Sequence, residues 1–281
     1  MFVLNQKLTQ ELTQNIINYY RSTPMTIQHL AEHFKLSVPT IIKVLQNNKI
    51  ERWNKYRLLS PDLDENYFDN IDNETKAYFL GLLLTDGNVY VDYSSNTRQK
   101  LFSLSLKQED AYLLKIFKEQ IHSHHKITTS SNNVSHLQVY STKMVESLIK
   151  LGVEPQKSTR EQFPFEVKKD MWRHILRGIF DGDGSAGFYA RPNRKSHRKC
   201  ICFCNGGTKL LEQISNFLFE ELGITKPVIR HECNAYIIRY TQNEAMEAII
   251  NYMYGEATVF LQRKKDVCNL ILKEIRQYRD N

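Results

Sequence analysis

The sequence has few of the features that mark secreted or membrane proteins. It holds only five cysteines, an odd number without disulfide-like spacing, which argues against a disulfide-stabilised extracellular fold. No signal peptide opens the chain, and no apolar run approaches the ~18 residues that a bilayer-spanning helix needs. We therefore expect a reduced, intracellular protein of the cytoplasm that has no membrane partner.

Three of the cysteines alternate along one predicted strand, at Cys200, Cys202 and Cys204. Alternate residues of a strand point to the same face, so the three thiols are expected to lie together. Zinc sites usually need two-residue spacers and a second pair of ligands, and both are missing here. The pattern favours a strand face of small residues over a metal site.

The charge distribution indicates a polyanionic partner. The chain carries a net charge of +7, and its 41 % hydrophobic content supports packed cores rather than disorder. Residues 1–73 hold equal numbers of basic and acidic residues, so the excess lies further along. It gathers between Arg191 and Lys199 and again at 263–265. Solvated loops carry similar clusters, so the charge supports nucleic-acid binding only beside other observations.

Residues 1–54 are predicted to form a small all-helical module. Apolar residues recur with a helical period in three segments, 8–21, 27–34 and 38–45. Thr26 and Ser37 are suitable N-caps for the second and third helices, which a short turn joins. This pattern resembles a DNA-binding helix-turn-helix, although a three-helix packing module without DNA contact stays open. The groove-facing candidates are Pro39, Thr40, Lys43, Gln46 and Asn47.

The rest of the chain contains an internal duplication. Residues 55–73 form an irregular acidic segment, predicted to be a linker that lies along the next domain through Tyr67 and Phe68. The motif at 79–87 then recurs 97 residues later, at 176–184. Each copy is followed by a predicted hairpin, helix, hairpin and helix, so we expect two αββαββα repeats of the α+β class, within 74–160 and 161–281.

Small residues recur inside the helix of each motif. A glycine within a helix costs about 1 kcal/mol relative to alanine, so its presence needs a reason. Gly81 and Thr85 are four residues apart, as are Gly178 and Gly182, and each pair therefore shares one helix face. Small residues at this spacing let two helix backbones approach closely. The two motif helices are thus predicted to pack against each other along these faces.

Such packing would bring the acidic ends of the two motifs together. Asp86 and Asp183 would then lie side by side, where two helix dipoles add to their negative charge. A spot of this kind is unfavourable unless it holds cations, and oxygen ligands suit Mg²⁺. Beside a basic surface it fits metal-assisted phosphodiester hydrolysis. A single Asp-Gly often only ends a helix before a turn, but two at matching positions favour the functional interpretation.

These motifs resemble the paired signature motifs of the LAGLIDADG homing endonucleases, in the single-chain form with two repeats. The segment 151–158, followed by Phe163-Pro164, is similar to the one that bridges the repeats in that family, and 260–264 is similar to its closing block. The resemblance covers residues 74–270 and leaves the helix-turn-helix outside it, as an appended module.

The resemblance implies a fold, a reaction and a cofactor. The two four-stranded sheets of that family form a saddle over DNA, with a pseudo-twofold axis between the repeats. The reaction is site-specific double-strand cleavage that promotes mobility of the enzyme's own gene or intron. It depends on Mg²⁺, or on another divalent cation such as Mn²⁺ or Ca²⁺. The partner is a long, asymmetric double-stranded DNA site, bound by a monomer.

The resemblance also assigns roles to residues. Asp86 and Asp183 match the catalytic acids that bind metal, with Gly87 and Gly184 beside them in the metal sites. Lys157 and Lys264 match lysines that polarise the attacking water or stabilise the phosphate. The neighbours Arg263 and Lys265 remain alternatives to Lys264.

Hairpin tips and sheet faces are expected to contact the DNA, since base readout requires donors and acceptors in the major groove. The candidates are Arg98, Gln99, Lys100, Arg191, Asn193, Arg194, Lys195, Arg198 and Lys199. The sixth motif position is Leu84 in one copy and Asp181 in the other, so the two sites are predicted to be unequal and could nick one strand faster.

Two other functions stay open from the sequence. One is a non-catalytic DNA-binding regulator of the same fold, and the other is an RNA maturase that assists intron splicing. Both acids are present, which favours cleavage over regulation. An intein is not expected, because no Cys or Ser begins the chain and Asn281 lacks a preceding His.

Overall fold

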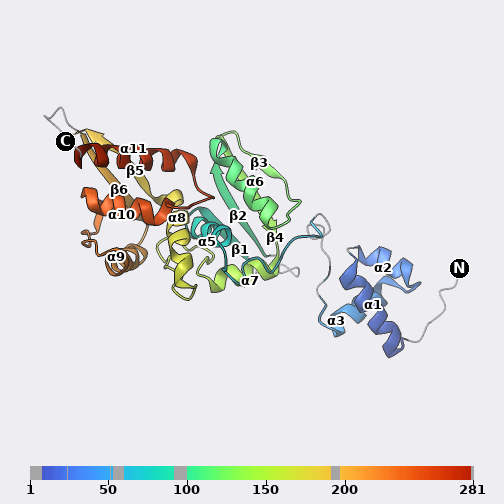
Figure 1. Cartoon of the computed structure of the whole chain (residues 1–281). Coiled ribbons are helices and arrows are strands. Elements are labelled where there is room, and N and C mark those ends of the chain that lie inside the picture. Colours follow the sequence, from blue (N-terminus) through green and yellow to red (C-terminus); the bar gives the residue numbers. More distant parts are fainter. Residues whose placement is uncertain are drawn as a thin grey trace. The chain divides into compact units, whose positions relative to one another are not determined.

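The chain divides into two compact units, each with its own core (Figure 1). A computed structural model describes residues 8–23, 25–50, 52, 60–91, 100–190 and 197–279. The first unit comprises Met1–Asp64 with His122–His125, and the second comprises Glu65–Ile121 with Lys126–Asn281. Among the described residues, no helix combines the length and the apolar character that a membrane crossing requires.

The described residues of the first unit form three helices, α1 (Gln10–Ser22), α2 (Ile27–His33) and α3 (Val38–Asn47). Thr26 and Ser37 cap the second and third as the sequence predicts. Thr26 Oγ1 accepts from the His29 backbone N–H at 3.2 Å, and Ser37 Oγ accepts from that of Thr40 at 3.3 Å. The side chains that form the core are Ile16, Ile17, Tyr20, Leu30, Ala31, Ile41, Val44 and Leu45.

The outer side of α3 carries the predicted DNA-contact residues. Lys43, Gln46 and Asn47 are exposed, and Thr40 is half-buried near the start of the helix. Apolar residues of α3 therefore face the core while these polar ones face outward, an arrangement compatible with a recognition helix. The role of this unit in DNA binding stays a prediction.

The second unit contains the two αββαββα repeats, so the predicted α+β fold class is confirmed. The elements of the first repeat are α5 (Glu74–Asp86), β1 (Gly87–Val91), β2 (Lys100–Lys107), η1 (Gln108–Asp110), α6 (Ala111–Gln120), β3 (Ile127–Thr129), β4 (Val134–Tyr140) and α7 (Thr142–Lys150). Those of the second are η2 (Lys169–Met171), α8 (Trp172–Asp183), β5 (Ser185–Ala190), β6 (His197–Asn205), α9 (Lys209–Leu222), β7 (Arg230–Glu232), β8 (Ala235–Tyr240) and α10 (Asn243–Tyr254). A long helix, α11 (Gln262–Arg279), follows.

Each repeat folds around a four-stranded antiparallel sheet. The strand orders are β1-β2-β4-β3 and β5-β6-β8-β7, so the two sheets have the same topology. In the first sheet side chains alternate between a buried and a more open face, as the period of two requires, whereas residues 200–203 of β6 are all buried. Leu104 and Ile201, 97 positions apart, are both fully buried on the helix-covered face. The two repeats predicted from the sequence therefore also bury equivalent residues.

Part of the predicted linker belongs to the core of the second unit. Tyr67 and Phe68 are buried, and both rings lie against Phe117 at centroid distances of 6.1 Å. Residues 53–59, at the start of that segment, lie outside the described residues. The two aromatic residues through which the segment was expected to contact the next domain are thus buried in that domain.

Candidate active site

The helices α5 and α8 pack against each other at the centre of the second unit (Figure 1). A Cβ atom added to Gly81 would lie 2.1 Å from the backbone oxygen of Ile175. One added to Gly178 would lie 2.2 Å from that of Tyr78. Real Cβ atoms do not approach so closely, so only glycine allows the two backbones to touch here. The interior glycines therefore set the distance between the two helices.

The seam continues toward the C-terminal ends of the two helices. A Cβ on Gly182 would lie 1.9 Å from Thr85 Oγ1. The Thr85 hydroxyl donates to the Leu82 carbonyl at 3.0 Å, which turns it back onto its own helix. The same hypothetical Cβ would lie 2.9 Å from Asp86 Oδ2. Thus the Asp86 carboxylate reaches the residue that directly precedes Asp183.

Asp86 and Asp183 end their helices next to each other; Asp86 is half-buried, whereas Asp183 is exposed to solvent. Burial, and then the negative charge of Asp183, raise the pKa of Asp86 from an ordinary value of 3.8 to about 6. Burial likewise raises the pKa of Asp183, against the opposing effect of two nearby lysines. Two neighbouring carboxylates at helix C-termini repel each other and the terminal carbonyls.

Two lysines approach this acidic pair, one in each half. Lys157 Nζ donates to the carbonyl of Gly87 at 2.6 Å and to that of Thr85 at 3.1 Å. Lys264 Nζ donates to the carbonyl of Gly184 at 2.6 Å. It also reaches those of Phe180, Asp181 and Gly182, at 2.8, 2.7 and 3.0 Å. Each ammonium group therefore satisfies carbonyl groups that the end of the motif helix leaves open.

Burial affects both lysines as it affects the acids, with the opposite sign. It lowers the pKa of Lys157, and it lowers that of Lys264 to about 8, while Asp86 and Asp183 act against the shift in both. Of the three consecutive basic residues 263–265, Lys264 is the one whose side chain reaches the site. Arg263 donates from Nε to Asp110 Oδ2 at 3.1 Å, and Lys265 Nζ lies 3.6 Å from the centre of the Phe260 ring.

The donor set fits a hard divalent cation. Asp86 and Asp183 are two neighbouring carboxylates, one half-buried and one exposed, and Mg²⁺ commonly binds through one or two carboxylates together with phosphate oxygens and water. Within the described residues, no group of three or more His, Cys, Asp or Glu side chains could hold a metal. A cation here would therefore complete its coordination from water or substrate. The carbonyls of Gly87 and Gly184 already accept from lysines, and their predicted part in metal binding stays a prediction.

The predicted DNA-contact residues of the sheets have different surroundings. Arg98, Gln99, Arg191, Asn193, Arg194 and Lys195 lie outside the described residues. Lys100 Nζ contacts Glu146 of α7 at 2.5 Å, and Lys199 Nζ lies 3.6 Å from Glu274 of α11. Arg198 projects to the other side of β6 from Lys199, and its Nη2 donates to Thr241 Oγ1 at 3.0 Å. The structure thus does not place these three charges on one surface.

The open face of the first sheet carries polar residues that were not among the predicted DNA contacts. Asn88, Ser103 and Gln138 are register partners across β1, β2 and β4. One step along, Ser105 Oγ and His136 Nδ1 are hydrogen-bonded at 2.8 Å. Amide, hydroxyl and imidazole groups in cross-strand rows suit contacts with base edges. Strand alternation in the sequence could have identified them.

The equivalent face of the second sheet differs in chemistry and is less exposed. The Sγ atoms of Cys200 and Cys202 lie 3.5 Å apart, and both residues are buried. Beside them Arg239, the register partner of Cys202, holds Glu232 through two hydrogen bonds of 3.1 and 2.9 Å. The alternating cysteines therefore share one strand face as predicted, and the face is thiol-rich where the first sheet is amide-rich.

Two further acidic residues near the motif helices have distinct positions. Glu161 is 7 % exposed, and its Oε2 has no hydrogen-bond partner among the residues that the structure describes. Its negative charge raises the pKa of both Lys157 and Asp183, so it lies close to the site. Asp181 does not join the acidic pair. Its carboxylate accepts from the Tyr78 and Tyr254 hydroxyls at 2.9 and 2.5 Å and from the Leu261 N–H at 2.7 Å.

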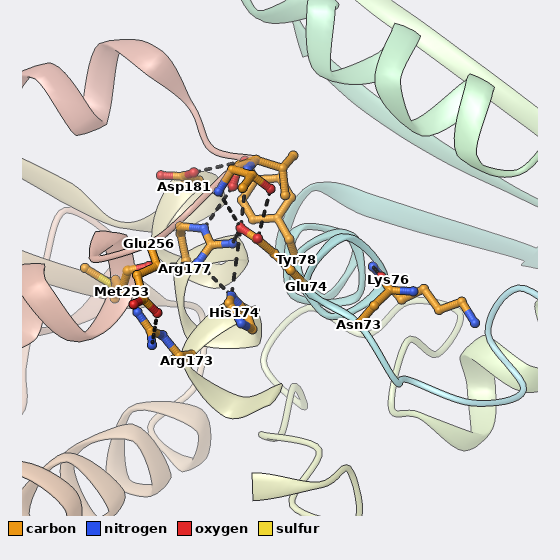
Figure 2. Close-up of polar contacts among 12 residues, drawn as sticks. Asn73, Glu74, Lys76, Tyr78, Arg173, His174, Arg177, Asp181, Met253 and Glu256 are labelled. Carbon is orange, nitrogen blue, oxygen red and sulfur yellow. Dashed lines mark hydrogen bonds and ion pairs between the residues drawn. The ribbon is translucent and has the colours of Figure 1, made fainter. Parts of the chain in front are cut away.

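A buried charged network continues from Asp181 along α8 (Figure 2). Arg177 is fully buried, and it donates to Glu74 Oε1 at 2.6 Å. It also donates to the carbonyls of Met253 and Val259, at 2.7 and 2.9 Å. This network joins α5, α8 and the segment between α10 and α11. The first repeat has leucines at the equivalent positions 80 and 84. The two motif helices therefore differ in their buried contacts, polar in the second repeat and apolar in the first.

Comparison with known proteins identifies the architecture of the second unit. No family model matches the sequence, and no curated protein matches it. Among solved structures, the LAGLIDADG meganuclease I-AabMI bound to uncleaved DNA is similar with a TM-score of 0.53 and 12 % identity, over 74 % of this chain and 92 % of that chain. The meganuclease I-SmaMI bound to uncleavable DNA is similar with a TM-score of 0.54 and 13 % identity, over the same shares. The two-repeat unit therefore has the fold of the LAGLIDADG homing endonucleases.

Proposed function

We propose that the protein is a site-specific DNA endonuclease of the LAGLIDADG type, which hydrolyses one phosphodiester bond in each strand of its target. The observation that carries this proposal is the pair Asp86 and Asp183. Glycine-packed helices bring these two carboxylates together, and a lysine approaches each helix end. The similarity in fold to meganucleases solved with DNA supports the same conclusion.

The acids are proposed to hold divalent cations, Mg²⁺ first among them, together with oxygens of the scissile phosphates. A cation bound there would polarise the phosphate and lower the pKa of an attacking water. The chain itself supplies the fixed carboxylates and two buried ammonium groups. Lys157 and Lys264 would stabilise negative charge that develops on the phosphates, in a site where low dielectric strengthens each interaction.

The open faces of the two sheets are proposed to lie against the major groove on either side of the cut. Because one sheet presents amide and hydroxyl groups and the other presents an arginine–glutamate pair beside buried cysteines, the two half-sites should differ in sequence. One chain contains both repeats, so a monomer can bind the whole asymmetric site. The first unit would add contacts through α3, and the net charge of +7 would make binding sensitive to salt.

Cleavage of this kind would promote mobility of the gene or intron that encodes the protein, inside the cell that holds the target. An invaded allele no longer contains an intact site, whereas an uninvaded one is cut and repaired by copying. The genomic context is an inexpensive check of this part of the proposal. A position of the gene within or beside an intron supports mobility, and an isolated position next to an operator-like repeat supports regulation.

The central test is cleavage of DNA that carries the candidate insertion site, with Mg²⁺ or with chelator. Asp86→Asn and Asp183→Asn should bind the DNA and fail to cut it. Asp170→Asn, the same chemical change at an exposed aspartate, should cut as the wild type does. Tight binding by the wild type without any Mg²⁺-dependent cut would refute the endonuclease and favour a regulator of the same fold.

A further inference from the structure

The carboxylate of Asp181 is tied to three separate elements of the second unit. It is only 2 % exposed, and its hydrogen bonds come from Tyr78 of α5, Tyr254 of α10 and the backbone of Leu261. A buried carboxylate with several donors is fixed in place, since moving it would leave those donors unpaired. Asp181 therefore links the motif helix to the residue that begins the turn into α11.

That turn carries Lys264. The Leu261 carbonyl accepts from the backbone N–H groups of Lys264 and Lys265, both at 3.1 Å, and so closes the first turn of α11. Lys264 then reaches back to α8, where the carbonyl of Asp181 itself is one of its acceptors at 2.7 Å. Asp181 thus holds the turn at two points, by its side chain at Leu261 and by its main chain at Lys264.

The first half fixes its lysine by other means. Leu84 stands where the second half has Asp181, and it is buried and apolar. Lys157 lies in the segment between α7 and α8, where its own carbonyl accepts from the Arg160 N–H at 2.7 Å. The side chain of Leu84 can form no hydrogen bond to that segment. The two lysines therefore occupy equivalent places at the ends of the motif helices, but different contacts hold them there.

We propose that Asp181 is a positioning residue for Lys264, and that it supports cutting of only one of the two DNA strands. The inference rests on the proposed endonuclease function, and it adds to that function a division of labour between the halves. Displacing a catalytic group by about 1 Å can slow a reaction by about 100-fold, so a small shift of the α11 turn is sufficient. The strand that depends on Lys157 should not respond.

The test measures each strand separately, on a duplex labelled at both ends, under single-turnover conditions with Mg²⁺. Lys157→Ala and Lys264→Ala first establish which strand depends on which lysine. Asp181→Asn should then slow the Lys264-dependent strand by about 10- to 100-fold and leave the other strand near its wild-type rate, so that nicked DNA accumulates. Tyr254→Phe, which removes one donor and leaves the Leu261 contact, should have the same direction and a smaller effect.

Amide hydrogen exchange gives a readout that does not need cleavage. Peptides across 259–266 should exchange faster in Asp181→Asn, whereas peptides across 155–162 should be unchanged. Asp266→Asn, which changes an aspartate of α11 that bonds to Gln262, should alter neither cleavage nor exchange around Lys264. Equal slowing of both strands, or unchanged exchange at 259–266, would overturn the inference. If the wild type cuts neither strand, the endonuclease proposal fails, and the exchange result alone decides whether Asp181 positions the turn.

Discussion

Replacing Gly178 by alanine should force α5 and α8 apart. The new Cβ would meet three backbone atoms: the oxygen of Tyr78 at 2.2 Å, the nitrogen of Leu82 at 2.7 Å and the Cα of Gly81 at 2.9 Å. None of these can rotate away as a flexible side chain would. Relief requires a separation of about 1.2 Å, the gap between 2.2 Å and the 3.4 Å at which ordinary van der Waals contact begins.

Two opposing effects decide the magnitude. Alanine is a better helix former than glycine by about 1 kcal/mol, which alone would stabilise the variant. Overpacking a tight core contact usually costs about 1–3 kcal/mol, and here the neighbours are rigid backbone, so the upper end applies. We expect a net loss of about 2 kcal/mol in unfolding free energy, and a fall of roughly 4–8 °C in the melting temperature of this unit.

Cleavage should fall as well, because the same displacement moves Asp183 away from Asp86. Urea denaturation and single-turnover cleavage would measure the two effects on the same preparation. Gly187→Ala is the matched control for stability, because its Cβ would meet only the Tyr189 ring at ordinary distances of 3.5–3.6 Å. A Gly178→Ala protein as stable and as active as the wild type would show that the helices do not touch through this glycine.

The acidic pair and the buried charges give three more predictions. Without divalent cations, Asp86→Asn should raise the unfolding free energy at pH 7–8 by at most about 3 kcal/mol. A raised acid pKa destabilises the folded state only as pH rises from 3.8 through about 6, so the gain should vanish by about pH 3 in urea titrations. An equal gain at both pH values would contradict the reasoning. Saturating Mg²⁺, at about 100 times its dissociation constant, should stabilise the wild type by about 2.7 kcal/mol and leave an Asp86→Asn/Asp183→Asn protein unchanged in thermal melts. Arg177→Leu should lower the unfolding free energy by about 3–5 kcal/mol, because it leaves the charge of Glu74 without its partner. Adding Glu74→Gln should recover part of that loss. Additive losses of the two substitutions in denaturation would exclude a direct pair.

Short-range patterns predicted much of this structure. Helical and strand periods located the elements of both repeats, because each element buries one face and the apolar spacing records which one. The interior glycines likewise predicted the helix seam, since a residue that costs helix stability needs a compensating contact.

Short-range sequence patterns could not predict contacts between residues that are distant along the chain. Asp181 finds Tyr78, Tyr254 and Leu261 at separations of 103, 73 and 80 residues, and no local spacing encodes such meetings. For the same reason the sequence does not reveal that Glu274 of α11 lies beside Lys199, whose contact with DNA stays a prediction. The sequence fixes which residues are basic, and only the packing determines which partner each one meets.

The buried network around Arg177 also makes the two halves unable to replace each other. Glu74 and Tyr78 of the first half bind Arg177 and Asp181 of the second through hydrogen bonds. At the equivalent positions of the second half, 97 residues later, the chain has Met171 and Ile175. A protein assembled from two copies of the second half would bury two arginines opposite methionines. Two copies of the first half would leave Glu74 without its guanidinium. The halves are therefore complementary rather than interchangeable, and a homodimer of either half would lose this network.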